Sequence, residues 1–383
     1  MTGTDLRLDL NEMPFYWRLH DRGAPAHPGI PQRLPYSFGV DPALGLLIER
    51  RNPSLLACLE EVYRAESNVG FMQDGHSLAK GYGGDFLDFI GRATAPLGIR
   101  RVVEIGCGGC YLLEKMRDMG FEVTGVDPSP IAVAKGKEKG IRVIADFFPS
   151  PLMDFKADLI FHVDVFEHVP DPVEFLKRQR ERLSDNGYVI INVPDGSSSI
   201  AAGDISIAFH QHLNNYDDRS LYNAVVAAGL HVVMIEKSKF GGSLYCLASV
   251  GPPAVPFQVS VPEGRAEAFL RKAAGAQARF RAIAEPLFAA GKELGFYMPL
   301  RAIPYLASIK RLEGVRLFDD IAHWHGRYID GMDVAIENYE DLVARPPAHL
   351  FIMSLTFGDV VKGKVLARVP GLPITTLKDI VAN

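Results

Sequence analysis

Residues 101–111 read RVVEIGCGGCY, and this stretch decides the fold class. A run of β-branched residues ends at Ile105 and is followed by a glycine-rich turn. A segment with helical spacing, YLLEKMRDMG, then begins at Tyr111 and closes at Gly120. A strand, a glycine turn and a helix in this order are typical of the first unit of an open α/β sheet. Glycines let the backbone approach a ligand there, and the start of the helix offers free amides.

The same alternation of apolar runs and helical segments continues to about residue 250. Further strands are expected at FEVTGVD, IRVIAD, ADLIFHVDV, YVIINVP, HVVMIEKS and SLYCLASV, and helices at PIAVAKGKEKG, PDPVEFLKRQRERLSDNG and SLYNAVVAAG. Apolar strands between helices predict a largely parallel sheet that helices cover on both faces. The expected fold is α/β, with a Rossmann-like sheet of seven strands whose last two form a hairpin.

The regions on either side of this sheet differ in composition. Residues 1–80 are rich in proline, glycine and turn residues and predict a loop-rich N-terminal module with one helix at LLACLEEVYRAE. The sheet domain occupies residues 81–250. Residues 251–290 begin with a proline-rich break and continue as a helical linker, and residues 291–383 alternate again as a small C-terminal α/β domain.

Charge and hydropathy exclude several classes of protein. Lys and Arg number 41 against 46 Asp and Glu, a net charge of −5, and no long basic run occurs, so nucleic acid is not an expected partner. No apolar stretch reaches membrane-spanning length, and the first residues lack a signal-peptide pattern. We therefore expect a cytoplasmic protein without a membrane partner.

Cys107 and Cys110 form a CxxC pattern inside the glycine-rich turn. Such pairs occur in thioredoxin-like redox sites and as half of a zinc site. No second cysteine pair lies nearby, and the four cysteines of the chain are too few and scattered for a disulfide framework. The pair is therefore interpreted as an incidental feature of the turn.

Several residues at successive strand ends are candidates for holding a nucleoside cofactor. They are Glu104, Gly106, Gly108, Asp127, Asp146 and Phe147. Asp127 closes the second strand, where a carboxylate can accept hydrogen bonds from two ribose hydroxyls. Asp146 and Phe147 follow the third strand, where an acid and an apolar neighbour can hold an adenine ring. The alternative is that both aspartates only cap loops, which is common for this residue type.

Three histidines are candidates for the chemistry. His168 follows the fourth strand in FEHVPD, at the sheet edge where ligands bind in open α/β folds. It either orients a substrate or moves a proton, or is a polar loop residue. His210 and His212 lie in FHQH after the fifth strand, and histidine is suited to act as a general base at neutral pH. No carboxylate or cysteine pattern accompanies these two histidines, so no metal is expected.

These segments together resemble bacterial deoxysugar C-methyltransferases, which methylate a carbon beside a ketone in a nucleotide-linked sugar. The resemblance rests on the turn at 104–109, Glu167-His168, His210-x-His212, Phe240-Gly241-Gly242-Ser243-Leu244 and the segment from Gly326 to Ile336. It implies a class I S-adenosylmethionine (SAM) fold, SAM as the cofactor and S-adenosylhomocysteine (SAH) as its product. It also implies a role in sugar or natural-product biosynthesis, with His212 as the base and with His168 and His210 near the substrate.

The chain departs from that family at three places. The family's N-terminal module holds zinc with four cysteines, whereas only Cys58 precedes residue 100 here, so no zinc is expected. The family's tyrosine–histidine–glutamate–histidine segment is Phe209-His210-Gln211-His212. The family's glycine-rich turn in the C-terminal domain is replaced by the segment from Tyr297 to Arg301.

These departures leave four interpretations open. The first is C-methylation of a keto-sugar nucleotide with His212 as base, and the second is O- or N-methylation of a sugar or another natural-product intermediate. The third is a nicotinamide-dependent sugar oxidoreductase, against which Tyr111 stands at the third glycine position of that fingerprint. The fourth is a protein that binds the cofactor without catalysis.

Overall fold

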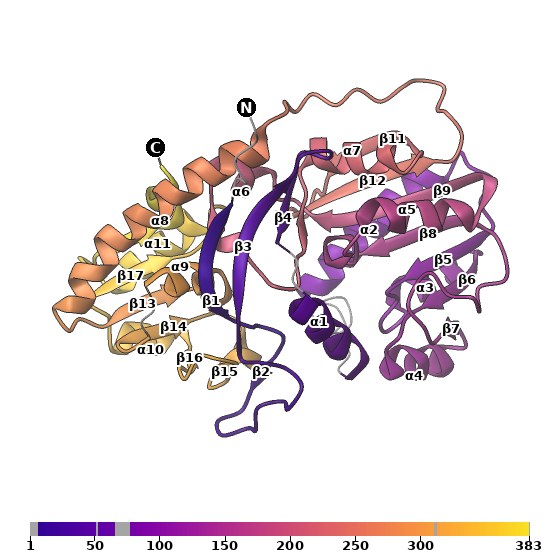
Figure 1. The fold of residues 1–383 in the computed structure, drawn as a ribbon. Helices are drawn as coiled ribbons and strands as arrows, with labels where there is room; N and C mark the ends of the chain where they lie inside the picture. The colour runs from indigo at the N-terminus through magenta and orange to yellow at the C-terminus, as the bar shows by residue number, and fades with distance from the viewer. Residues whose placement is uncertain (1–6, 51–52, 66–76, 310–311, 383) are drawn as a thin grey trace.

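The structure is a computed structural model, and it describes residues 7–50, 53–65, 77–309 and 312–382. Its centre is a sheet of seven strands in the order β11-β12-β9-β8-β5-β6-β7 (Figure 1). The strands are β5 (Arg101–Ile105), β6 (Glu122–Val126), β7 (Arg142–Ile144), β8 (Ala157–Val163), β9 (Leu183–Pro194), β11 (His231–Lys237) and β12 (Ser243–Ser249). Strands β5 to β9 are parallel, whereas β12 runs antiparallel to both β9 and β11. The predicted seven-stranded α/β sheet with a terminal hairpin is confirmed.

Helices cover both faces of this sheet. Successive strand residues point to opposite sides, and the residues on both sides are apolar. Val102 of β5 packs in one apolar core with Phe86 and Leu113, whereas the next residue, Val103, packs in the other with Leu176. The helices are α2 (Ser77–Thr94), α3 (Tyr111–Asp118), α4 (Pro130–Lys139), α5 (Pro172–Glu181) and α7 (Asp218–Ala227). The short helices α6 (Ser197–Ala202), Phe166–His168 and Ile205–Ile207 lie in the connections.

One helix ends earlier than its sequence indicates. The run from residue 170 to the glycine stop at 187 predicts a single helix, but α5 ends at Glu181 and β9 begins at Leu183. Leu183 is already paired with Ala157 of β8, and the amide of Ala157 donates to the carbonyl of Arg182. The pairing of Leu183 with β8 therefore ends the helix before the glycine at residue 187.

The N-terminal module is more regular than the expected loop-rich region. Strands β1 (Leu8–Pro14), β3 (Arg33–Asp41) and β4 (Leu46–Glu49) form an antiparallel sheet that ends at β10 (Asn214–Asn215). In β3 the alternate residues Leu34, Tyr36 and Phe38 are buried, which is the period-two pattern of a strand with one buried face. The helix predicted at LLACLEEVYRAE is α1 (Pro53–Ala65).

A second parallel sheet forms the C-terminal part, in the order β16-β14-β13-β17-β18. Its strands are β13 (Leu294–Tyr297), β14 (Val315–Phe318), β16 (Ile336–Glu337), β17 (His349–Ile352) and β18 (Ile374–Thr376). Its helices are α9 (Pro299–Ile309), α10 (Tyr339–Ala344), α11 (Gly358–Arg368), α12 (Leu377–Val381) and the short turn Ala322–Trp324. The strands β2 (Leu19–His20) and β15 (Tyr328–Ile329) pair and tie this part to the N-terminal module.

The predicted helical linker is a long helix, α8 (Arg265–Ala289), which lies along the second sheet (Figure 1). Phe280 of α8 contacts the rings of Phe296 in β13 and Phe351 in β17. Nearer the start of α8, Phe269 contacts Phe38 of β3. Because its apolar face is buried in that core, we propose that α8 belongs to the C-terminal domain instead of linking two domains.

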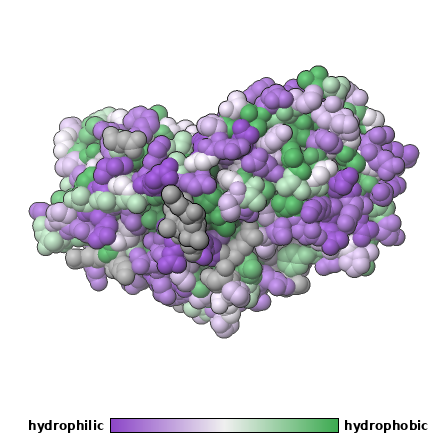
Figure 2. All heavy atoms as spheres, turned by 45° about the horizontal axis from the view of Figure 1, so that its top comes forward, coloured by the Kyte–Doolittle hydropathy of each residue, from purple (hydrophilic) through white to green (hydrophobic). Residues whose placement is uncertain are grey.

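The outline of the molecule in Figure 2 has a notch between two lobes, and polar side chains cover most of the face drawn there. Within the described ranges, no helix combines the length and apolar character needed to cross a membrane.

Candidate functional site

A cavity of about 550 Å³ opens at the carboxyl ends of β5, β6 and β8 and beside the loop after β7. This is the edge of an open α/β sheet where ligands bind, and the volume suits a cofactor-sized molecule. All six residues predicted to hold a cofactor line this cavity. The wall opposite the sheet comes from α1, through Leu56, Leu59 and Tyr63.

The floor of the cavity is the glycine-rich turn after β5. Gly106 and Gly108 have φ angles of +73° and +44°, in the left-handed region that disfavours side chains. A Cβ atom on Gly106 would lie 2.6 Å from the side chain of Val165, in the loop after β8. The turn therefore needs glycine for its conformation and for the close approach of the neighbouring loop.

Asp127 holds this turn against the end of β6. Its carboxylate accepts hydrogen bonds from the amide of Gly108 at 2.9 Å and from the amide of Ser129 at 2.8 Å. Burial raises the pKa of the Asp127 carboxyl group above its usual value, although both hydrogen bonds oppose the shift. Each carboxylate oxygen has a second lone pair, so Asp127 can also accept bonds from a diol.

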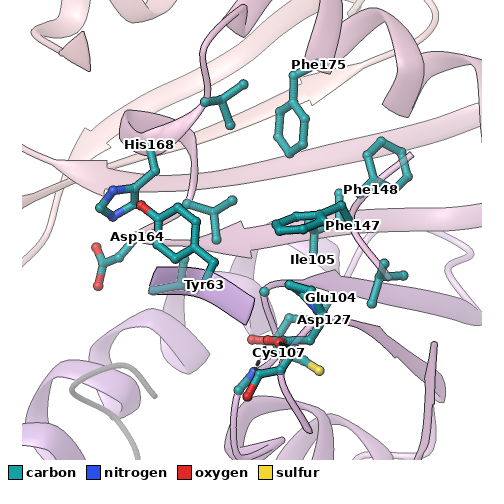
Figure 3. Close-up of a pocket in the computed structure, with 18 of the residues that line it drawn as sticks. Tyr63, Glu104, Ile105, Cys107, Asp127, Phe147, Phe148, Asp164, His168 and Phe175 are labelled. Atoms are coloured by element: carbon teal, nitrogen blue, oxygen red, sulfur yellow. Dashed lines mark hydrogen bonds between the residues drawn. The ribbon is translucent and has the colours of Figure 1, made fainter. Parts of the chain in front are cut away.

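Glu104 ends β5 beneath the cavity and is 3% exposed. Its Oε2 atom has no hydrogen-bond partner within the described ranges, and burial raises the pKa of this carboxyl group well above its usual value. Such a group is stabilised by a donor on a bound ligand. Asp146 accepts a hydrogen bond from the amide of Phe147 at 2.8 Å, and Phe147, Phe148 and Phe175 form an apolar end of the cavity (Figure 3).

Two of the three predicted histidines meet at the other end of the cavity. The rings of His168 and His212 lie edge to face with centroids 5.2 Å apart, and His168 lines the cavity. Nδ1 of His168 lies 2.6 Å from the carbonyl oxygen of Gln211 and so donates to it, which leaves Nε2 as the acceptor nitrogen. Burial lowers the pKa of His168 to about 4. Burial, and then the charges of His168 and Arg301, lower the pKa of His212 to about 3.

The third histidine is placed elsewhere. His210 is 2% exposed, and its Nε2 lies 3.1 Å from the carbonyl oxygen of Leu34. The rings of Phe15 and Tyr36 pack around it in the N-terminal module. The geometry therefore gives His210 a packing role and does not bring it to the cavity, contrary to its prediction as a catalytic residue.

Two acidic residues that the sequence did not single out as catalytic lie beside the histidine pair. Asp164 lines the cavity, accepts a hydrogen bond from the Tyr82 hydroxyl at 2.9 Å, and has its pKa raised to about 6 by burial. Glu167 is 2% exposed, and neither carboxyl oxygen has a hydrogen-bond partner within the described ranges. Burial, and then the charge of Asp164, raise the pKa of Glu167 well above its usual value.

Tyr63 of α1 completes this end of the cavity. Its ring lies edge to face with that of His168 at 6.0 Å, and burial raises the pKa of its hydroxyl far above the usual value (Figure 3). The ligand atoms of Glu167, His168 and His212 lie within 4.8 Å of one another, a spacing that a metal ion could bridge. The cavity thus joins an acid- and glycine-lined end to an end that carries two neutral histidines and two buried acidic residues whose pKa values are raised.

Residues 76–235 match the family model described as a methyltransferase domain. Together with the strand order and the cavity, this match shows that the chain contains a SAM-dependent methyltransferase domain of the Rossmann-like class I fold. SAM is therefore the cofactor of this class of domain.

Curated relatives agree with this class. The ubiquinone biosynthesis O-methyltransferase of Azorhizobium caulinodans is 32% identical over 133 residues, which cover 32% of this chain and 49% of the relative. The mitochondrial ubiquinone biosynthesis O-methyltransferase of Schizosaccharomyces pombe is 25% identical over 182 residues, 44% of this chain and 66% of the relative. The chain spans about half the length of the first of these relatives.

Solved structures with the same kind of domain include a SAM-dependent methyltransferase from Clostridium acetobutylicum. It has 14% identity and a TM-score of 0.37, and the match covers 47% of this chain and 95% of that one. Magnesium protoporphyrin IX methyltransferase from Synechocystis, with bound SAM, has 15% identity and a TM-score of 0.36 over 50% of this chain and 89% of that one.

Proposed function

We propose that the protein is a SAM-dependent methyltransferase whose acceptor binds beside His168 and His212, and that His212 removes the acceptor's proton. One observation carries this proposal: a pair of neutral histidines at the end of the cofactor cavity. With pKa values of about 4 and about 3, both rings are unprotonated at neutral pH, as a base must be. His168 is proposed to orient the acceptor through Nε2, which lies 3.5 Å from Oε1 of Glu167.

We propose that the residues at the carboxyl ends of β5 and β6 and in the loop after β7 hold the cofactor. Asp127 accepts bonds from the ribose hydroxyls, Asp146 and Phe147 hold the adenine ring, and Glu104 faces the turn formed by Gly106 and Gly108. SAM held in this way would supply the methyl group, and the histidine pair would contact the acceptor at the other end of the cavity. The protein then raises the rate mainly by positioning the two reactants, because methyl transfer requires the nucleophile in line with the departing sulfur.

The proposed acceptor is a nucleotide-linked deoxysugar, methylated on a carbon beside a ketone. Such a carbon must lose a proton before it can attack the methyl group, and the resulting enolate needs hydrogen-bond donors. The Tyr63 hydroxyl is a buried donor beside His168, and the raised pKa of Glu167 favours the protonated form in which its carboxyl group can also donate. The influence of Arg301 on His212 supports an acceptor that also touches the C-terminal domain, since Arg301 belongs to α9.

The alternative is transfer to oxygen or nitrogen of a sugar or another natural-product intermediate. The names of the curated relatives, which are O-methyltransferases, favour oxygen. A hydroxyl acceptor needs a base but no enolate donors. Under this alternative His212 keeps its role, whereas Glu167 and Tyr63 do not affect turnover directly.

Labelled SAM and a panel of acceptors distinguish these functions. The panel contains thymidine-diphosphate 3-keto and 4-keto sugars, the corresponding amino sugars, and catechol-type hydroxyl compounds. Label on carbon, located by NMR, supports the proposal, and label on oxygen or nitrogen supports the alternative. No transfer to any acceptor by protein that binds SAM would contradict both.

A further inference from the structure

We propose that Cys107 and Cys110 are a redox-active dithiol, and that their oxidation to an intramolecular disulfide closes the cofactor site. Their Sγ atoms lie 3.9 Å apart in the turn between β5 and α3. A disulfide needs the two atoms at about 2.05 Å, so a small movement of the turn is enough to bring them to bonding distance. The sequence alone offered no reason to assign this pair a role.

The position of the pair connects its oxidation to cofactor binding. Gly108, which lies between the two cysteines, donates to Asp127, and Cys107 lines the cavity beside Asp127 (Figure 3). The Sγ atom of Cys107 also fills the space above Gly125, where a Cβ atom would lie 2.4 Å from it. A bond to Cys110 pulls this sulfur out of that space and strains the link between Gly108 and Asp127.

The surroundings of Cys110 favour its thiolate. It stands directly before the eight-residue helix α3 with a left-handed φ of +58°. The contact with Cys107, and then the charge of Lys139, lower the pKa of Cys110 below the usual value, whereas the pKa of Cys107 is raised. The 3.9 Å contact between the two sulfurs provides a direct route for a proton to move from Cys107 to Cys110.

Access decides which sulfur reacts first. Cys110 is fully buried, whereas Cys107 is 5% exposed and borders the cavity, so an oxidant reaches Cys107 through the empty cofactor site. After passing its proton to Cys110, the Cys107 thiolate attacks one sulfur of a small disulfide such as oxidised glutathione and releases one small thiolate. That thiolate takes the proton from Cys110.

The second step closes the protein disulfide. Cys110, now a thiolate, attacks the Cys107 sulfur of the mixed disulfide and displaces the second small thiolate, which is protonated by solvent. The protein loses two electrons, and the small disulfide gains them as two thiols. Bound SAM or SAH covers Cys107, so the cofactor is expected to protect the pair.

The test begins with the reduced full-length chain, treated with oxidised glutathione with and without saturating SAH. Trypsin releases residues 102–115 as one peptide that contains both cysteines. Without SAH this peptide is expected to become two hydrogens lighter, and the affinity for SAH measured by calorimetry is expected to fall about tenfold or more, comparable to the loss of one charge-assisted hydrogen bond. Dithiothreitol restores both, and SAH present during oxidation prevents both.

Matched variants assign the effect to the pair. Cys107→Ser is expected to bind SAH equally before and after oxidation, whereas Cys246→Ser, in β12, remains sensitive. Protection of the wild-type chain by SAH tests the proposal even if Cys107→Ser does not fold. A peptide that stays in the dithiol form, a disulfide that leaves SAH affinity unchanged, or equal losses in Cys107→Ser would each overturn the inference.

Discussion

His168 and His212 are brought edge to face at 5.2 Å by two different parts of the fold. His168 closes the short helix after β8, and its Nδ1 donates to the carbonyl of Gln211. That hydrogen bond fixes the segment carrying His212 against the sheet domain. The pair therefore depends on a backbone contact as much as on the two side chains.

Replacing His212 separates catalysis from cofactor binding. His212→Ala is expected to lower kcat about 10²- to 10⁴-fold, because a general base contributes on that order, while the Kd for SAM stays unchanged. The control is His210→Ala, which removes a buried ring from the N-terminal core and is expected to lower the melting temperature with a much smaller effect on kcat. Equal losses of turnover and SAM affinity in His212→Ala would show that His212 is not the base.

Replacing Asp127 tests the cofactor end. Asp127→Ala leaves the amides of Gly108 and Ser129 without their partner and removes the acceptor for the ribose, so SAM affinity is expected to fall about 10- to 100-fold. Asp171→Ala is the matched control, since its carboxylate accepts from the amide of Glu174 at the start of α5 and Asp171 is not among the described residues that line the cavity. Calorimetry with SAM measures both variants. Wild-type affinity in Asp127→Ala would refute its assignment.

The histidine pair is expected to stay neutral well below pH 6. Because burial places the pKa of His168 at about 4 and that of His212 at about 3, lowering the pH from 7 to 6 does not protonate either ring. NMR of the protein with isotopically labelled histidine, assigned with His168→Gln and His212→Gln, measures the two titrations. Midpoints near 6.5 for both rings would contradict the burial of the pair.

His162 gives a pH dependence of stability that is independent of the site. It is fully buried in β8, and burial lowers its pKa to about 3 in the folded protein. The unfolded chain therefore binds an extra proton below pH 6.5, so the folded state loses stability as the pH falls. Relative to His162→Phe, the wild type is expected to lose about 2 kcal/mol between pH 7 and 5. Urea unfolding of both at the two pH values measures this difference, and parallel losses would contradict it.

Metal removal tests whether Glu167, His168 and His212 act on the acceptor directly or hold a metal ion. Burial raises the pKa of Glu167, which disfavours the carboxylate form that binds metal, and dialysis against a chelator is expected to leave turnover unchanged. Elemental analysis of the purified chain measures bound metal directly. Loss of turnover together with a stoichiometric metal, restored by adding that metal back, would instead assign Glu167, His168 and His212 as its ligands.

The sheet, and the meeting of the candidate cofactor residues at one of its edges, could be predicted from sequence because both follow local rules. Apolar runs between helices determine a parallel sheet, and polar residues at the ends of parallel strands meet at one edge, as Glu104 and Asp127 do. The N-terminal sheet was missed because proline and glycine interrupt the alternation of Leu34, Tyr36 and Phe38.

The acceptor end could be predicted only in part. Tyr63 belongs to a helix far from the other residues in sequence, and nothing local indicates its contact with His168. Residues 209–212 have no regular period, so the sequence could not indicate that His212 contacts His168 while His210 packs in the N-terminal module. Asp164 and Glu167 lie next to His168 in the sequence, directly after β8. This position at the carboxyl end of a strand is the sequence feature from which both could have been predicted as site residues.

The pairing of β10 with β4 places limits on how this enzyme can be divided. Asn214 and Asn215, immediately beyond the histidine segment, pair with Ile48 and Leu47, and the amide of Glu49 donates to the carbonyl of Leu213. The residues that match the methyltransferase family model therefore include those proposed to hold SAM, whereas β10 within them is paired with β4 from the chain's first fifty residues. Grafting residues 76–235 alone onto another protein would transfer the residues proposed to hold SAM. It would leave behind β4, the strand that pairs with β10 directly after the histidine segment. A functional transplant would have to move both pieces together.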